Sequence, residues 1–402
     1  MSGMSDQPPR RVRLVLAFSA LVILLSAVSR APAAADAPAE ARAEARADKP
    51  RRLLYVASPG IRDYLEYGGH GVLVYDIDHG HSFVRRIPTR GVSKEGKPLN
   101  VKGVCASAAT GRLYVSTIQS LMCLDLATDQ LRWEKQPEGG CDRMAITPDG
   151  KLIFTPSLEG PHWNVIDAST GDVVQKVVVN SGAHNTMCGL DGRFAYFAGL
   201  KSPVLRVFDV EKREVVREVG PFGNVIRPFT VNGAGTLCFV NVNELLGFEV
   251  GDLAGGKMLH RVEVEGFKKG PTKRHGCPSH GVALTPDEKE LWLTDAANSR
   301  LHVFDATVMP PRQGQSVELT DQPGWVTFGL DGRYAYPSTG DVIDAKTKQI
   351  VAVLRDEHEN RVQSEKMLEI DFGADGKPVK AGDQFGIGRV AGAEAEAGRA
   401  EK

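Results

Sequence analysis

The chain has 402 residues, of which 42% are hydrophobic and 25% are charged, and its formal net charge is −1. This is an ordinary globular composition. Because there is no overall basic excess to attract polyanions, we expect no nucleic-acid partner. Glycine is frequent, with 43 residues, which suits a fold with many tight turns.

The N-terminal segment predicts export. Closely spaced arginines precede an apolar run over residues 14–28, and small residues follow. This order is typical of a secretory signal peptide, and the run is shorter than the about 20 residues of a membrane span. We expect a signal peptide over residues 1–35, a linker over residues 36–50 and a periplasmic or secreted protein without a membrane span after cleavage. An uncleaved N-terminal anchor is the alternative.

A strand pattern then repeats seven times. Each copy is a short, mostly apolar run that ends in an acidic residue, as in LRVFD. These acidic residues lie 39 to 56 residues apart, at Asp76, Asp125, Asp167, Asp209, Glu249, Asp305 and Asp344. A period near 40–50 residues with short strands is typical of propeller blades. The sequence predicts an all-β, seven-bladed β-propeller of four-stranded blades over residues 51–385, with the acidic residues binding turn amides.

Turn residues mark the first hairpin of each blade from the second onward. Asp-Gly or a related pair begins at positions 110, 149, 191, 234, 287 and 331, and glycine accepts the positive φ of such turns. The residues five and three positions before each turn are mostly apolar, which is the alternation expected of a strand.

The first unit lacks its own first strand, and the C-terminus carries a spare one. Residues 366–377 place Ile370 and Phe372 five and three positions before the turn residue Asp375. We predict that this segment crosses over as the innermost strand of blade 1, which closes the ring and removes a free sheet edge. We expect a disordered tail over residues 386–402.

Three segments carry a family resemblance: IDASTGDVV, ITPDGKLIF and LTPDEKELWLTDAANSRLHVFD. They resemble the bacterial YVTN-repeat propellers, also called YncE-like, and the resemblance covers residues 51 to about 378. It implies an exported propeller. It leaves the chemistry open, because such propellers include binding proteins, lactonases, lyases and oxidoreductase subunits.

The seventh position before each turn is expected at the mouth of the central channel. These positions hold Gly103, Asp142, His184, Arg227, His280 and Gly324, with Leu368 in the closing strand. Four ionisable groups at one height predict a ligand site, and we expect the glycines to leave room for the ligand. The neighbouring Arg143, Asn185 and Trp325 are further ligand-binding candidates.

Histidine and carboxylate suggest candidate chemistry at this mouth. The candidate catalytic residues are His184, His280, Asp142 and Glu369, as acid–base groups or ligands. The candidate metal ligands are His184, His280 and His275, and imidazoles would suit zinc or copper. Arg227 is the candidate clamp for a carboxylate or phosphate. A solvated polar mouth without a metal is the alternative, since no spacing such as H-E-x-x-H occurs.

An insertion over residues 251–279 adds a basic run next to His275. It contains Lys268, Lys269, Lys273 and Arg274, and long loops are often binding loops. The run could attract an anion or be a solvated surface loop. The pairing of the six cysteines is not determined by their spacing.

Two functions follow from these patterns. The favoured one is a binding propeller that holds a small molecule or a periplasmic partner protein at the channel mouth. The alternative is a metal-dependent lyase, lactonase or oxidoreductase that uses the histidines. The cofactor is unknown, with zinc or copper as candidates, and we expect a monomer.

Overall fold

The fold is described by a computed structural model over residues 49–390. The expected signal peptide and residues 36–48 of the linker lie outside this part, as do residues 391–402. Within residues 49–390, none of the helices has the length and apolar character needed to cross a bilayer.

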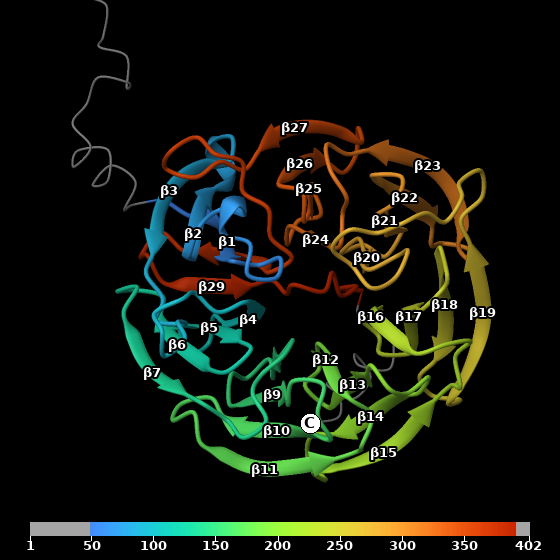
Figure 1. The fold of residues 1–402 in the computed structure, drawn as a ribbon, viewed down its shortest axis with the longest axis horizontal. Coiled ribbons are helices and arrows are strands. Elements are labelled where there is room, and N and C mark those ends of the chain that lie inside the picture. The colour runs from blue at the N-terminus through green and yellow to red at the C-terminus, as the bar shows by residue number, and fades with distance from the viewer. Residues whose placement is uncertain (1–48, 391–402) are drawn as a thin grey trace, which may run out of the picture. The chain divides into compact units, whose positions relative to one another are not determined.

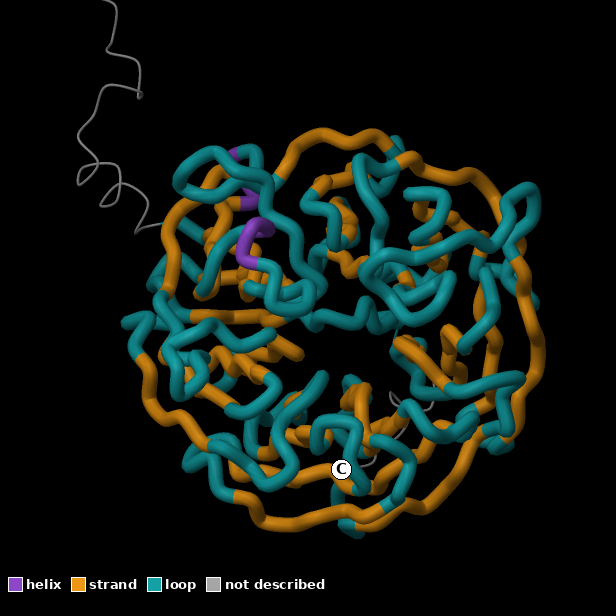
Figure 2. Tube along the Cα trace, viewed as in Figure 1, coloured by secondary structure: helices purple, strands orange, loops and turns teal. Residues whose placement is uncertain are grey.

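Seven antiparallel sheets form a ring, which confirms the seven-bladed all-β propeller (Figures 1 and 2). In blade 2 the strands are β4 (Val101–Ser107), β5 (Arg112–Thr117), β6 (Leu121–Asp125) and β7 (Leu131–Lys135). In blade 3 they are β8 (Ala145–Ile146), β9 (Leu152–Pro156), β10 (His162–Asp167) and β11 (Val173–Val178). In blade 4 they are β12 (Ala183–Cys188), β13 (Phe194–Gly199), β14 (Leu205–Asp209) and β15 (Glu214–Val219).

The next three blades continue the ring. Blade 5 contains β16 (Ile226–Val231), β17 (Leu237–Val242), β18 (Gly247–Asp252) and β19 (Lys257–Glu263). Blade 6 contains β20 (Val282–Leu284), β21 (Glu290–Asp295), β22 (Arg300–Asp305) and β23 (Arg312–Glu318). Blade 7 contains β24 (Val326–Phe328), β25 (Tyr334–Pro337), β26 (Asp341–Asp344) and β27 (Gln349–Val353).

Blade 1 joins the two ends of the propeller. It contains β1 (Arg51–Ser58), β2 (Gly71–Asp76) and β3 (Ser82–Ile87), with the short 3₁₀ turns η2 (Leu65–Tyr67) and η3 (Ile77–His79). The C-terminal β28 (Met367–Phe372) pairs antiparallel with β1, with Leu53 opposite Ile370, so the predicted closure is confirmed. The sequence did not predict the fifth strand, β29 (Pro378–Ala381), which pairs with the free edge of β28.

Residues 382–390, here called the crossing segment, run from β29 across the middle of the ring towards β16 (Figure 1). The Gly386 carbonyl accepts from Leu284 N at 2.9 Å, and Gly388 N donates to the Val231 carbonyl at 3.0 Å. The packed chain therefore continues beyond residue 385, where we expected the propeller to end.

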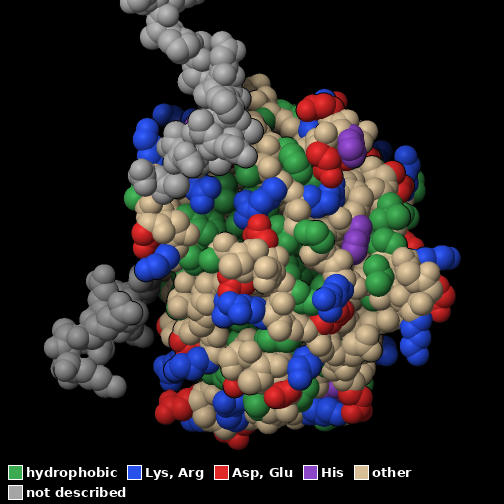
Figure 3. Space-filling model, turned by 90° about the vertical axis from the view of Figure 1, so that its left-hand side faces the viewer, with side chains coloured by type: hydrophobic (Ala, Val, Ile, Leu, Met, Phe, Trp, Pro, Cys, Tyr) green, Lys and Arg blue, Asp and Glu red, His purple; other side chains and the backbone are tan. Residues whose placement is uncertain are grey.

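The core lies between neighbouring blades. Trp163 of blade 3 stacks on Phe197 of blade 4 with ring centroids 4.8 Å apart, and both side chains are fully buried. Aromatic pairs of this kind dominate core energetics. On the side of the ring seen in Figure 3, basic and acidic side chains are interspersed.

The acidic residues at the strand ends bind turn amides in six of the seven blades, as Asp125 does with the N–H groups of Ala127 and Thr128. Blade 5 is the exception. Glu249 binds Gly223 N and Arg261, and the turn amides are bound by Asp252, three residues later.

Candidate functional site

The loops that precede the innermost strands enclose a cavity of about 220 Å³, here called the mouth cavity. His184 in β12, Arg227 in β16 and His280 just before β20 all line it. These three residues come from successive blades at equivalent heights, as the repeat register predicts. Further lining residues come from blades 1, 2 and 3 and from the loop that contains His275.

Asp142 lies fully buried beside this cavity and orients His184. Its Oδ2 is 2.6 Å from His184 Nδ1, and Lys102 Nζ lies 3.3 Å from its Oδ1. Arg143 Nη1 lies 2.9 Å from His184 Nε2. Because a guanidinium only donates, Nε2 accepts and the Nδ1–H donates to Asp142. Both ring nitrogens of His184 are therefore already occupied.

The protonation states agree with this arrangement. Burial lowers the pKa of His184 to about 4, so its imidazole is neutral at pH 7. Burial alone would raise the pKa of Asp142, but His184 and Lys102 hold it at about 2. His184 is thus a neutral, fixed side chain instead of a free base.

Glu365 is the centre of a second buried network. Its Oε2 accepts from Arg143 Nη2 and from Lys366 Nζ, each at 2.7 Å, and its Oε1 lies 3.1 Å from His275 Nδ1. Burial opposes the charge on Glu365, yet Lys366 and His275 hold its pKa well below the usual value. Burial lowers the pKa of Lys366 to about 7. One carboxylate therefore faces the Arg143 guanidinium and an amine that is about half protonated at pH 7.

Glu365 occupies the height that the sequence analysis assigned to Leu368. In blade 4, Cys188 pairs with Ala195, and in blade 1 the equivalent pair is Glu369 with Leu54. The register counted from Asp375 is therefore wrong by three residues, because β28 continues further before its turn. Glu369 instead accepts from Leu330 N at 2.8 Å, near the first hairpin turn of blade 7, and the structure does not bring it to the mouth.

Arg227 lines the mouth cavity without a counter-ion. No salt bridge to it occurs within residues 49–390, and its buried Nε has no hydrogen-bond partner there. Its guanidinium packs against Gly276, where a Cβ atom would lie 2.3 Å from Nη2. By contrast, Arg274 in the same wall is bound by Asp321 and Gln363.

His275 and His280 stack with ring centroids 5.1 Å apart. One potential ligand atom from each of these histidines and one from Glu365 lie within 4.8 Å of one another. His280 Nδ1 is 3.0 Å from the Gly324 carbonyl, so it donates there and Nε2 keeps its lone pair. The structure thus brings together two of the three predicted metal ligands, with Glu365 in the place of His184.

The two glycines predicted at the channel mouth, Gly103 and Gly324, do not leave room for a ligand. A Cβ at Gly324 would lie 1.9 Å from the His275 ring. A Cβ at Gly103 would lie 3.1 Å from Met144 N of the next blade. These positions allow close packing of the protein itself.

Trp325 packs behind the wall of the mouth cavity, against Arg143 and Lys366 of the lining. Its ring lies 4.8 Å from Arg143 Cζ and 5.5 Å from Lys366 Nζ, as cation–π contacts. Asn185 is fully buried, and its amide atoms have no hydrogen-bond partner among the described residues.

All six cysteines are buried and unpaired. Cys277 lies beside Arg227, and burial raises the pKa of its thiol to about 11. Because the thiolate is the nucleophile and the metal ligand, this neutral thiol is suited to neither role at pH 7.

No protein-family model and no curated protein matches this sequence. Among solved structures, the dihydro-heme d1 dehydrogenase NirN in complex with DHE aligns with a TM-score of 0.57 at 15% identity, over 82% of this chain and 73% of that one. Hydrazine synthase of Kuenenia stuttgartiensis aligns with a TM-score of 0.43 at 13% identity, over 68% of this chain and 99% of that one. At such identities the first similarity supports the propeller fold alone, and the second adds nothing to it.

Proposed function

We propose that the protein binds a small anionic molecule, a carboxylate or a phosphate, in the mouth cavity. The observation that carries this proposal is Arg227, a cation in the cavity wall without a salt bridge in residues 49–390. Ligand pockets for drug-sized molecules measure about 300–1,000 Å³. The 220 Å³ of this cavity favours a ligand of few heavy atoms.

The charge balance of the cavity supports an anion. Its lining contains six Lys or Arg side chains and two carboxylates. Lys102 is balanced by Asp142 and Arg274 by Asp321, whereas Arg143 and Lys366 share Glu365. A bound anion would supply the missing negative charge, and a bidentate guanidinium contact would fix its orientation.

Isothermal titration calorimetry with the full chain tests this proposal. The probes are inorganic phosphate and succinate, with uncharged succinamide as the matched control. We expect one anion to bind and Arg227→Gln to weaken its binding at least about tenfold. The control variant is Arg312→Gln, on the exposed outer strand β23. If neither anion binds the wild-type protein, or if Arg227→Gln binds as tightly, the proposal is wrong.

A metal-dependent enzyme is the second candidate function, on the observation that His275, His280 and Glu365 offer three clustered ligand atoms. Three such ligands would leave a position open for substrate on zinc or copper. Arg143 and Lys366 already bind Glu365 and oppose a divalent cation. Elemental mass spectrometry of the purified protein decides between the anion-binding protein and the metal-dependent enzyme. About one metal per chain, lost in a folded His275→Ala/His280→Ala variant, would favour the enzyme. A metal-free wild-type protein after reconstitution would exclude it.

We also propose that the chain is exported, with a signal peptide over residues 1–35 and a linker over residues 36–50, and that it is a YVTN-repeat propeller. The support is the order of charged, apolar and small residues before residue 36 and the repeated segments. N-terminal sequencing of protein from a periplasmic fraction should find a start near residue 36. An intact N-terminus in the membrane fraction would favour the retained anchor. Light scattering should find a monomer.

A further inference from the structure

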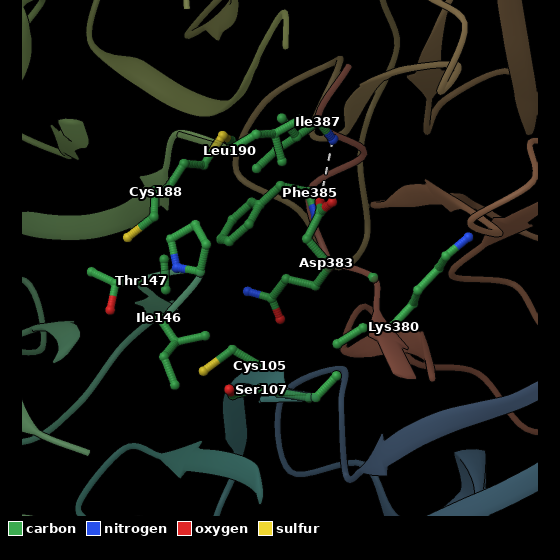
Figure 4. A pocket seen from close by; sticks show the side chains of 18 of the residues that line it. Cys105, Ser107, Ile146, Thr147, Cys188, Leu190, Lys380, Asp383, Phe385 and Ile387 are labelled. Carbon is green, nitrogen blue, oxygen red and sulfur yellow. Dashed lines mark hydrogen bonds between the residues drawn. The ribbon is translucent and has the colours of Figure 1, made fainter. Parts of the chain in front are cut away.

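A second cavity lies at the opposite end of the innermost strands, and we call it the turn-side cavity (Figure 4). It has a volume of about 620 Å³, and its wall comes from the ends of β4, β8 and β12 and from the crossing segment. This volume is in the range of small-molecule sites. Trp325 separates the two cavities, because its ring contacts Arg143 on one side and Phe385 on the other.

The wall of the turn-side cavity is mostly apolar, and its Asp383 carboxylate is already paired. Asp383 accepts from the backbone N–H groups of Phe385 and Ile387 and pairs with Arg389 at 3.0 Å. Lys380 extends its amine away from the other labelled side chains (Figure 4). A charged ligand would therefore find no buried counter-ion among the lining residues, which favours a neutral one.

The two thiols of the lining are neutral as well. Burial raises the pKa of Cys105 and of Cys188 well above the usual value. Neutral thiols behave as small, polarisable apolar groups. They extend the apolar wall and do not add charge to it.

Gln384 is the exception in this wall, because it offers an unused donor. Its side chain is 1% exposed, and its Oε1 accepts from Val104 N at 2.9 Å. This contact fixes the orientation of the amide, since a backbone N–H requires an acceptor. Nε2 then has no hydrogen-bond partner in the described part of the chain. Buried donors are nearly always satisfied in native proteins, so a ligand with an acceptor would complete this one.

We propose that the turn-side cavity binds a neutral, mostly apolar small molecule whose carbonyl or ether oxygen accepts a hydrogen bond from Gln384 Nε2. The apolar wall supplies affinity through buried area. The single amide donor supplies orientation, as is usual for pockets of this kind. This site is independent of the anion site proposed for the mouth cavity.

Fluorescence titration of the full chain tests the proposal with two probes. One is prodan, a neutral naphthalene that carries a ketone, and the other is its propyl analogue, in which a methylene replaces the ketone. We expect prodan to bind with blue-shifted emission. Ile146→Trp, which fills the cavity, should weaken binding at least about tenfold. Ile350→Trp, on the exposed outer strand β27, should not change it.

The hydrogen bond from the Gln384 amide is tested by comparing the affinities of both probes for the wild-type protein and for one variant. In Gln384→Met, whose fold is checked by circular dichroism, the preference for the ketone over the methylene should fall about fivefold, the value of one neutral hydrogen bond. Equal preference in wild type and variant would overturn the role of Gln384. Absent prodan binding to the wild-type protein, or unchanged binding to Ile146→Trp, would overturn the site itself.

Discussion

Gly276→Ala should weaken anion binding in the mouth cavity while leaving the stability of the fold almost unchanged. Gly276 is exposed and has no positive φ, so alanine suits its backbone. The new Cβ would lie 2.3 Å from Arg227 Nη2, where ordinary contact begins at 3.4 Å. The flexible guanidinium must therefore retreat by about 1 Å. Loss of one charge-assisted hydrogen bond costs about 1.5–3 kcal/mol, or about 10- to 150-fold in affinity.

Calorimetry with the anion that binds the wild-type protein measures this loss, and thermal denaturation should show a stability change within about 0.5 kcal/mol. Gly270→Ala in the same loop is the matched control, because its Cβ would meet only the Ala297 methyl group. In an Arg227→Gln background, Gly276→Ala should have no further effect on binding. Wild-type affinity in Gly276→Ala, or the same loss in both backgrounds, would refute the role of the guanidinium.

Three further predictions concern the stability of the fold, at Glu369, Leu368 and Gly324. Burial raises the pKa of Glu369 to about 8. The folded state then holds a proton that the unfolded state has lost, and stability should fall as the pH rises from about 4.5 to 8. Glu369→Gln should reduce the change of melting temperature with pH. An unchanged pH dependence would contradict the raised pKa of Glu369. Leu368→Ala, at a fully buried site of the closing strand, should cost about 2–5 kcal/mol in chemical denaturation. Gly324→Ala, whose Cβ would lie 1.9 Å from the His275 ring, should cost about 1–3 kcal/mol through overpacking, and a wild-type melting temperature would contradict this.

The blades could be predicted from sequence because each repeats the same local chemistry. An acidic residue at a strand end binds the turn amides that follow, as Asp125 does, and glycine at the hairpin accepts positive φ, as Gly150 does. Such signals depend on neighbouring residues alone. The closing strand was visible because residues 367–372 alternate as a strand does, although the phase of that alternation was counted three residues off.

The errors arose where the register depends on distant pairing. Glu249 and Asp252 both end an apolar run, and only the pairing of Asp252 with Leu237 shows which one faces the turn. Likewise, Glu365 reaches the mouth because β28 pairs with β1 three residues further along than its turn suggests. A count from the nearest turn cannot detect such a shift. Glu365-Lys366 could have been noticed as a charged pair directly before an apolar strand.

The central channel is better understood as two sites than as one passage. Trp325 contacts Arg143, Lys366 and His280 with its ring, while its indole N–H donates to the backbone carbonyl of Gln384. Above it the wall carries guanidinium, ammonium and imidazole groups, and below it aliphatic side chains and thiols. A propeller closed only by β28 would leave the turn end of its channel uncovered. The crossing segment covers that end, completes the apolar wall formed by β4, β8 and β12, and contributes the single amide donor. The chain extension beyond the closing strand therefore creates the second site.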